Sequence, residues 1–224
     1  MGQDVKLTAS DGFKLGGYRA DPAGAPKAAI VVIQEIFGVN HHIRSVCDRL
    51  AGAGYVAIAP SIFDRIEPNF QCGYSPDEIA NARKFVANPD WKAMLLDTQA
   101  AIDAVKTTGP VGIIGFCLGG SIAYAAATKL SGLSAAIGYY GGAVVRFADD
   151  KPKVSTQLHF GEKDTGIPLT DVEIIRNKRP EVEIHVYPGA QHGFNCEERA
   201  SYDKASADIA RPRSAEFLAR HLRK

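Results

Sequence analysis

The segment 115–120 (Gly-Phe-Cys-Leu-Gly-Gly) places a cysteine between an apolar run and a stretch of small residues. Residues 111–115 have the composition of a buried strand, and residues 121–130 have that of a helix. A residue between two such elements sits on a sharp turn with its side chain exposed, and the flanking glycines avoid crowding that turn. The helix N-terminus would also favour a thiolate. The segment therefore predicts a nucleophile at Cys117.

Two further reactive side chains follow later strands. Asp164 follows the predicted strand 156–161, and His192 lies in a glycine-bounded loop after the predicted strand 182–187. Because functional groups collect at the carboxyl ends of parallel strands, these side chains should meet Cys117. The imidazole would take the thiol proton, the carboxylate would fix its tautomer, and the histidine would then protonate the leaving group. Taken alone, Asp164 fits an ordinary turn aspartate equally well.

The segment 34–40 (Gln-Glu-Ile-Phe-Gly-Val-Asn) ends another buried strand and adds a fourth feature. The backbone N–H groups of Ile36 and Leu118 are placed as the two donors of an oxyanion hole. Glu35 comes directly after an apolar strand, so we expect its carboxylate to face the site and to accept a hydrogen bond from the Cys117 thiol. The alternative is a turn glutamate that faces solvent.

Composition narrows the classes of partner. The net charge of +1 offers no footprint for nucleic acid or an acidic membrane, and no apolar stretch approaches the ~20 residues that span a bilayer. No two histidines have the spacing of a zinc motif, and His42 is assigned to a helix start, so we predict neither a metal site nor a cofactor. Four scattered cysteines and the lack of a visible secretory signal predict a cytoplasmic protein, either a monomer or a weak homodimer.

Strands and helices alternate around these residues. The sequence predicts buried strands at 28–34, 55–59, 111–116, 134–140, 156–161 and 182–187, after a hairpin within 5–18. This alternation predicts one three-layer α/β domain over residues 1–224, with a mostly parallel sheet of about eight strands and an antiparallel N-terminal hairpin. Residues 61–90 are irregular and are expected near the active site. Pro212 should kink the last helix or mark its start.

These motifs resemble the dienelactone hydrolase (carboxymethylenebutenolidase) family, a cysteine branch of the α/β-hydrolase superfamily. The resemblance rests on segments 34–40 and 115–120, on Gly-Tyr-Tyr-Gly at 138–141, and on the elements around Asp164 and His192. It runs through nearly the whole chain. It implies the α/β-hydrolase fold and hydrolysis of a carboxylate-bearing enol-lactone in aromatic catabolism. It also implies a Cys-His-Asp triad and an acyl-thioenzyme intermediate.

The resemblance further implies a resting state in which Glu35 holds the Cys117 thiol away from His192 until substrate displaces it. In the family, arginines hold the substrate carboxylate, and Arg65 in the irregular segment has the matching place of one. The alternative for Arg65 is a surface arginine paired with a nearby carboxylate.

The second family arginine lies four residues after the histidine, where this chain has Cys196. Arg199 is the candidate replacement. The expected partner is a small anionic lactone or ester. Because the arginine is displaced, a hydrolase with a broader range of carboxyl esters and thioesters is an alternative. A catalytically silent member of the fold that binds a small molecule is another, although a complete set of reactive residues argues against it.

Overall fold

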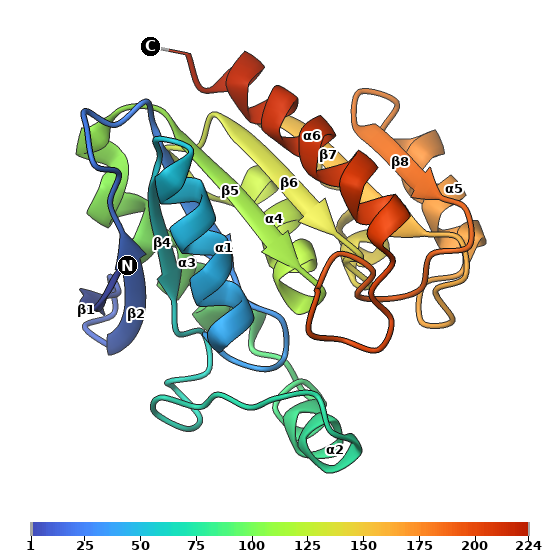
Figure 1. Ribbon diagram of the computed structural model, residues 1–224, viewed down its shortest axis with the longest axis horizontal. Coiled ribbons are helices and arrows are strands. Elements are labelled where there is room, and N and C mark those ends of the chain that lie inside the picture. Colours follow the sequence, from blue (N-terminus) through green and yellow to red (C-terminus); the bar gives the residue numbers. More distant parts are fainter. Residues whose placement is uncertain (1, 224) are drawn as a thin grey trace.

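An eight-stranded sheet with the order β1-β2-β4-β3-β5-β6-β7-β8 forms the centre of the computed structural model, which describes residues 2–223 (Figure 1). The six strands from β3 onward are parallel to one another, whereas β2 runs antiparallel to both β1 and β4. The predicted mostly parallel sheet with an antiparallel N-terminal hairpin is confirmed. The strands are β1 (Gln3–Thr8), β2 (Lys14–Ala20), β3 (Ala29–Ile33), β4 (Val56–Pro60), β5 (Val111–Phe116), β6 (Ala135–Tyr139), β7 (Ser155–Gly161) and β8 (Glu183–Tyr187).

Helices cover both faces of this sheet (Figure 1). One face carries α1 and α6, and the other carries α3 and α4. The helices are α1 (His41–Gly52), α2 (Pro76–Lys84), α3 (Trp91–Val105), α4 (Leu118–Lys129), α5 (Leu169–Lys178) and α6 (Lys204–His221), with short 3₁₀ turns η1 (Lys106–Thr108) and η2 (Val144–Phe147). None of the helices in residues 2–223 is long and apolar enough to cross a membrane.

The two helical layers explain why the strand sequences are apolar without alternation. In β5, Val111 and Ile113 pack into the core beneath α3 and α4, whereas Ile114 and Phe116 pack into the core beneath α1 and α6. A strand buried on both faces needs an apolar residue at every position. Because β3 to β8 run parallel, their carboxyl ends lie at one edge of the sheet. Polar residues that follow these strands therefore lie at that carboxyl edge.

Helix boundaries follow the local sequence. The Asn40 side chain accepts a hydrogen bond from the Ile43 N–H at 3.3 Å, which caps α1 at the predicted residue. Asp203 caps α6, and Pro212 lies inside that helix. The alternative in which Pro212 marks the helix start is therefore wrong. The start is set eight residues earlier, where the Asp203 side chain accepts from the Ala205 N–H.

The irregular segment 61–90 leaves the sheet after β4 and contains α2, which projects away from the sheet in Figure 1. Its own aromatic residues hold it together, since the rings of Phe63 and Phe70 both pack on Phe85, with centroids at 5.1 and 4.2 Å. A bridge between Gly38 and Gln71 fastens it to the segment after β3. The chain then returns to the carboxyl edge of the sheet, where α3 begins.

Candidate active site

Cys117 occupies a strained turn between β5 and α4. Its φ of 55° and ψ of −116° lie where residues with a side chain are rarely found. The turn is tight because the two elements nearly touch: a Cβ on Gly115 would lie 1.9 Å from the Gly119 carbonyl oxygen. A Cβ on Gly119 would lie 2.4 Å from the carbonyl oxygen of Ile33. Glycine at both positions therefore lets the turn present the half-buried Cys117 side chain at the carboxyl edge.

The structure brings His192 and Asp164 together at the same edge. His192 Nδ1 lies 2.7 Å from Asp164 Oδ2, and Asp164 Oδ1 accepts a hydrogen bond from the Gly166 N–H at 2.9 Å. The carboxylate is buried and can only accept when ionised, so the proton on this side of the ring belongs to Nδ1. The other nitrogen, Nε2, is thereby free to exchange a proton with Cys117.

Cys117 is the main charged neighbour of His192. Burial by itself disfavours the imidazolium, but the negative charge of Cys117 and hydrogen bonds to Asp164 and Cys117 outweigh it and raise the pKa of His192 to about 10. A positively charged imidazole beside a cysteine sulfur is the arrangement that cysteine nucleophiles use. The ring also packs against Tyr140, with centroids 5.1 Å apart.

Two backbone N–H groups at this edge have no acceptor. The amides of Ile36 and Leu118 make no hydrogen bond within residues 2–223. Leu118 is the first residue of α4, where the helix leaves its N–H groups unpaired, and Ile36 lies just after β3. Both residues line the cleft that contains Cys117. The pair can therefore stabilise an oxyanion formed on a carbonyl carbon next to the sulfur.

The cleft has a volume of about 340 Å³, which suits a small molecule. Its polar and reactive lining comes from Cys117, Ser121, Arg146 and His192, and three residues of the irregular segment contribute to its wall. The remaining lining residues are Ile36, Val86, Ala87, Pro89, Trp91, Leu118, Gly142, Ala143, Gly166 and Ile167. Of these described lining residues, Arg146 alone carries a permanent charge, and none is acidic.

Sequence reasoning missed Arg146. The residue lies in η2, directly after β6, and its exposed side chain makes no hydrogen bond or ion pair within the described part of the chain. A usable signal was present, because β6 neighbours the nucleophile strand β5 and its carboxyl end must open onto the same edge. What the sequence could not give is the path of the chain after Gly141.

The expectation for Arg65 is corrected. Its guanidinium donates two hydrogen bonds of 2.8 Å to the buried Asp97 and pairs with Asp11 at 2.9 Å, while it stacks on the Phe13 ring at 4.2 Å. Asp97 is only 1% exposed, so Arg65 compensates a buried charge. Arg65 does not line the cleft that contains Cys117. It joins the irregular segment to α3 and to Asp11, and these pairings engage all three guanidinium nitrogens.

The expected hydrogen bond from the Cys117 thiol to Glu35 is also absent. Glu35 is buried as predicted, but its Oε1 accepts from Arg199 Nη1 at 2.8 Å, and its Oε2 has no partner within residues 2–223. Arg199 thus reaches the neighbourhood of Cys117 but is engaged by Glu35, beside the ring of Phe37. A buried carboxylate attracts a buried guanidinium more strongly than a neutral thiol, which explains the exchange of partner.

Glu35 also belongs to a group of residues that could hold a metal ion. Its carboxylate, the His42 ring and the Cys196 sulfur offer ligand atoms that all lie within 4.8 Å of one another. Glu35 and His42 lie close together in the sequence, but Cys196 comes from a segment far along the chain, so spacing along the sequence does not identify the group. Cys117 and His192 are not part of this group.

The chain is similar to a known protein family over most of its length. The model of the dienelactone hydrolase family matches residues 15–222. A protein of Synechocystis sp., named "Putative carboxymethylenebutenolidase", is 37% identical over 93% of this chain and 94% of its own length. The carboxymethylenebutenolidase of Pseudomonas putida is 30% identical over 97% of this chain and 96% of its own length.

A solved structure is also similar to this chain over nearly its whole length. The crystal structure titled "Putative Dienelactone Hydrolase" from Klebsiella pneumoniae superposes with a TM-score of 0.86 at 31% identity. The superposition covers 98% of this chain and 99% of that protein. The chain therefore belongs to the dienelactone hydrolase family and is a hydrolase with the α/β-hydrolase fold.

Proposed function

We propose that this protein hydrolyses a small enol-lactone that carries a carboxylate, of the dienelactone type, to an open-chain product of the maleylacetate type. The observation that carries the proposal is the composition of one cleft. It holds a nucleophile, its base, two unpaired N–H groups and a free arginine, and no acidic residue lines it. The cleft is therefore suited to an acyl group with a nearby anion.

The proposed reaction has two halves. The Cys117 thiolate attacks the lactone carbonyl carbon, and the resulting oxyanion is held by the N–H groups of Ile36 and Leu118. Collapse breaks the ring C–O bond, gives a thioester on Cys117, and releases an enolate that takes the proton of His192. Water then attacks the thioester, with His192 as base and Asp164 holding its Nδ1–H. The sum consumes one water and forms one carboxylic acid.

Arg146 is proposed to bind the substrate carboxylate. A guanidinium can donate two parallel hydrogen bonds to a carboxylate, and this one has no other partner in the described chain. Arg199, the earlier candidate, already donates through Nη1 to Glu35, so it is less available to a substrate carboxylate than Arg146. An anion that draws Arg199 away would also free Glu35, so a substrate-triggered change at Glu35 remains part of this proposal.

The intermediate can be tested by acid quench during turnover of a dienelactone, followed by intact mass measurement. We expect a population of wild-type protein heavier by the mass of the substrate. Cys117→Ala should show no adduct and should lose activity by at least about 10³-fold. Turnover by Cys117→Ala at the wild-type rate would exclude Cys117 as the nucleophile.

The role of Arg146 can be tested by comparing a dienelactone with its neutral methyl ester. For Arg146→Gln we expect KM for the acid to rise about tenfold, equivalent to about 1.4 kcal/mol, with little change for the ester. Arg65→Gln is the matched control: it should destabilise the fold, because it leaves Asp97 unpaired, but should not discriminate between the two substrates. An equal loss for both substrates in Arg146→Gln would remove Arg146 from carboxylate recognition.

A further inference from the structure

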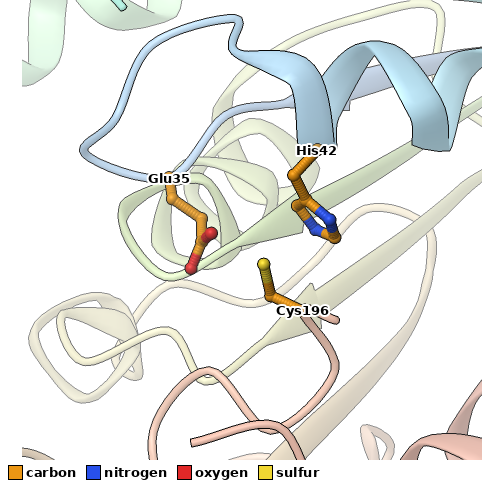
Figure 2. A group of neighbouring side chains, drawn as sticks. All are labelled: Glu35, His42 and Cys196. Atoms are coloured by element: carbon orange, nitrogen blue, oxygen red, sulfur yellow. The ribbon is translucent and has the colours of Figure 1, made fainter. Parts of the chain in front are cut away.

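Three side chains with metal-binding atoms face one another beside the catalytic turn, and Figure 2 shows them directed at a common centre. Glu35 follows β3, His42 lies in the first turn of α1, and Cys196 lies in the loop that follows β8. All three are buried, and their ligand atoms lie within 4.8 Å of one another. The group brings one oxygen, one nitrogen and one sulfur into a small volume.

Two polar atoms of this group make no hydrogen bond to any described residue. Glu35 Oε2 and His42 Nε2 are buried and have no hydrogen-bond partner within residues 2–223, and each residue is only 1% exposed. The Cys196 thiol donates a weak hydrogen bond of 3.4 Å to the Tyr74 hydroxyl, and its sulfur accepts one from the Glu198 backbone N–H. Buried polar atoms are nearly always paired, so two orphaned atoms directed at one point indicate a missing ligand.

We propose that Glu35, His42 and Cys196 bind a divalent transition metal ion, with Zn²⁺ as the best match. Zn²⁺ accepts carboxylate, imidazole and thiolate together, whereas Ca²⁺ and Mg²⁺ take oxygen ligands. Zinc–ligand distances place tetrahedral ligand atoms about 3.3–3.8 Å apart, so atoms at the 4.8 Å limit of the group need to close by about 1–1.5 Å. The fourth position is open to water or to a neighbouring hydroxyl group.

The surroundings supply what a buried site of this kind needs. A thiolate and a carboxylate supply two negative charges against the double charge of the ion, and with the Arg199 guanidinium beside Glu35 the cluster carries one positive charge. Arg199 donates to Glu35 Oε1 and leaves Oε2 for the metal, which fixes the carboxylate from outside as hydrogen bonds around metal ligands commonly do. On binding, the thiol proton of Cys196 is released to solvent.

A metal here would connect three segments that also position the catalytic groups. Glu35 is adjacent to Ile36, whose N–H faces the cleft, and Cys196 is in the same loop as His192. The ion would therefore fix the loop after β3 relative to the loop after β8. Its role is structural, since neither His192 nor Cys117 is among its ligands.

The test uses metal-free full-length protein titrated with Co²⁺, because tetrahedral Co²⁺ bound to a thiolate gives visible d–d bands and a near-ultraviolet charge-transfer band. We expect one equivalent of Co²⁺ to produce both bands and Zn²⁺ to displace it. Cys117→Ser keeps all three proposed ligands and removes the competing active-site thiol, so it should retain the bands. Cys196→Ser should lose the charge-transfer band.

Loss of a ligand should weaken binding at least as much as loss of an outer hydrogen bond, which costs about 10–100-fold in affinity. His42→Gln is the second variant and keeps the thiol, so it is informative even if Cys196→Ser does not fold by circular dichroism. Bands that survive in Cys196→Ser but vanish in Cys117→Ser would assign the metal to the catalytic pair and overturn the proposal. Failure of wild-type protein to bind Co²⁺ or Zn²⁺ stoichiometrically would also overturn it.

Discussion

At the scale of single residues, the chemistry depends on which partner each ionisable side chain meets. His192 is bracketed by a carboxylate on Nδ1 and by the Cys117 sulfur, and their combined effect outweighs burial and raises its pKa. Among the described residues, the Glu35 carboxylate accepts its one hydrogen bond from Arg199. Two carboxylates at the same edge thus have different tasks. Asp164 pairs with the His192 imidazole, where the proposed mechanism needs a carboxylate, and Glu35 pairs with an arginine.

The first prediction concerns Asp164→Asn. The hydrogen bond and the charge of Asp164 both favour the imidazolium, so their loss lowers the pKa of His192 from about 10. His192 must be protonated to supply the enolate with a proton, so the alkaline limb of kcat/KM should move to lower pH. The rate itself should fall by roughly 10²–10⁴-fold. The measurement is a pH–rate profile, supported by an NMR titration of the imidazole.

Asp171→Asn is the matched control, since Asp171 lies in the first turn of α5 and makes no contact with His192. It should leave the alkaline limb in place. If Asp164→Asn shifts the limb to higher pH, the carboxylate does not support the imidazolium and the proposed proton path fails.

At the scale of secondary structure, the turn between β5 and α4 is made possible by contacts between backbones. The approach of Gly115 to Gly119, and of Gly119 to the end of β3, leaves no room for a side-chain atom. These contacts bring the N-terminus of α4 beside the segment after β3, which places the N–H groups of Leu118 and Ile36 on one cleft. The glycines therefore build the oxyanion hole as well as the turn.

The second prediction is that Gly115→Ala destabilises the fold by about 3 kcal/mol or more. Its Cβ would lie 1.9 Å from a backbone oxygen, and backbone atoms cannot move aside as a flexible side chain can. Gly52→Ala at the end of α1 is the matched control, because nothing lies within 4 Å of its Cβ, and it should be neutral or slightly stabilising. Urea unfolding compares the two, and equal stability would show that the turn can relax.

At the scale of the whole molecule, one ion pair links the segment after β3 to the loop before α6. Glu35 and Arg199 are 164 positions apart in the sequence, and their side chains are 1% and 17% exposed. Removing one residue of a pair this well buried is strongly destabilising, because the remaining charge is left in the protein interior without a counter-charge and without hydration. It therefore holds the two catalytic loops together.

The third prediction follows from that burial. Arg199→Met should lower stability by about 3–5 kcal/mol, because it leaves the Glu35 charge buried and alone. The double variant Glu35→Gln with Arg199→Met removes both charges and should be more stable than Arg199→Met alone. Urea unfolding in metal-free buffer measures both. A double variant less stable than the single one would mean that Glu35 has a compensating partner besides Arg199.

Local sequence predicted the elements and the turn that carries Cys117. The short apolar runs at β3 and β5 favour strands buried on both faces, and the glycines around Cys117 favour a tight turn, since both signals come from neighbouring residues. The parallel order then required Asp164 and His192 to end at the same edge, which is why they could be named before any contact was known.

Partner choice among charged side chains was decided by the tertiary structure. Arg65 was expected to meet substrate and instead compensates Asp97, while Arg146 was overlooked and lines the cleft. Glu35 was expected to hold a thiol and instead holds Arg199, beside His42 and Cys196. A long side chain can reach any of several partners, and only the packed path of the loops fixes which one lies within 3 Å.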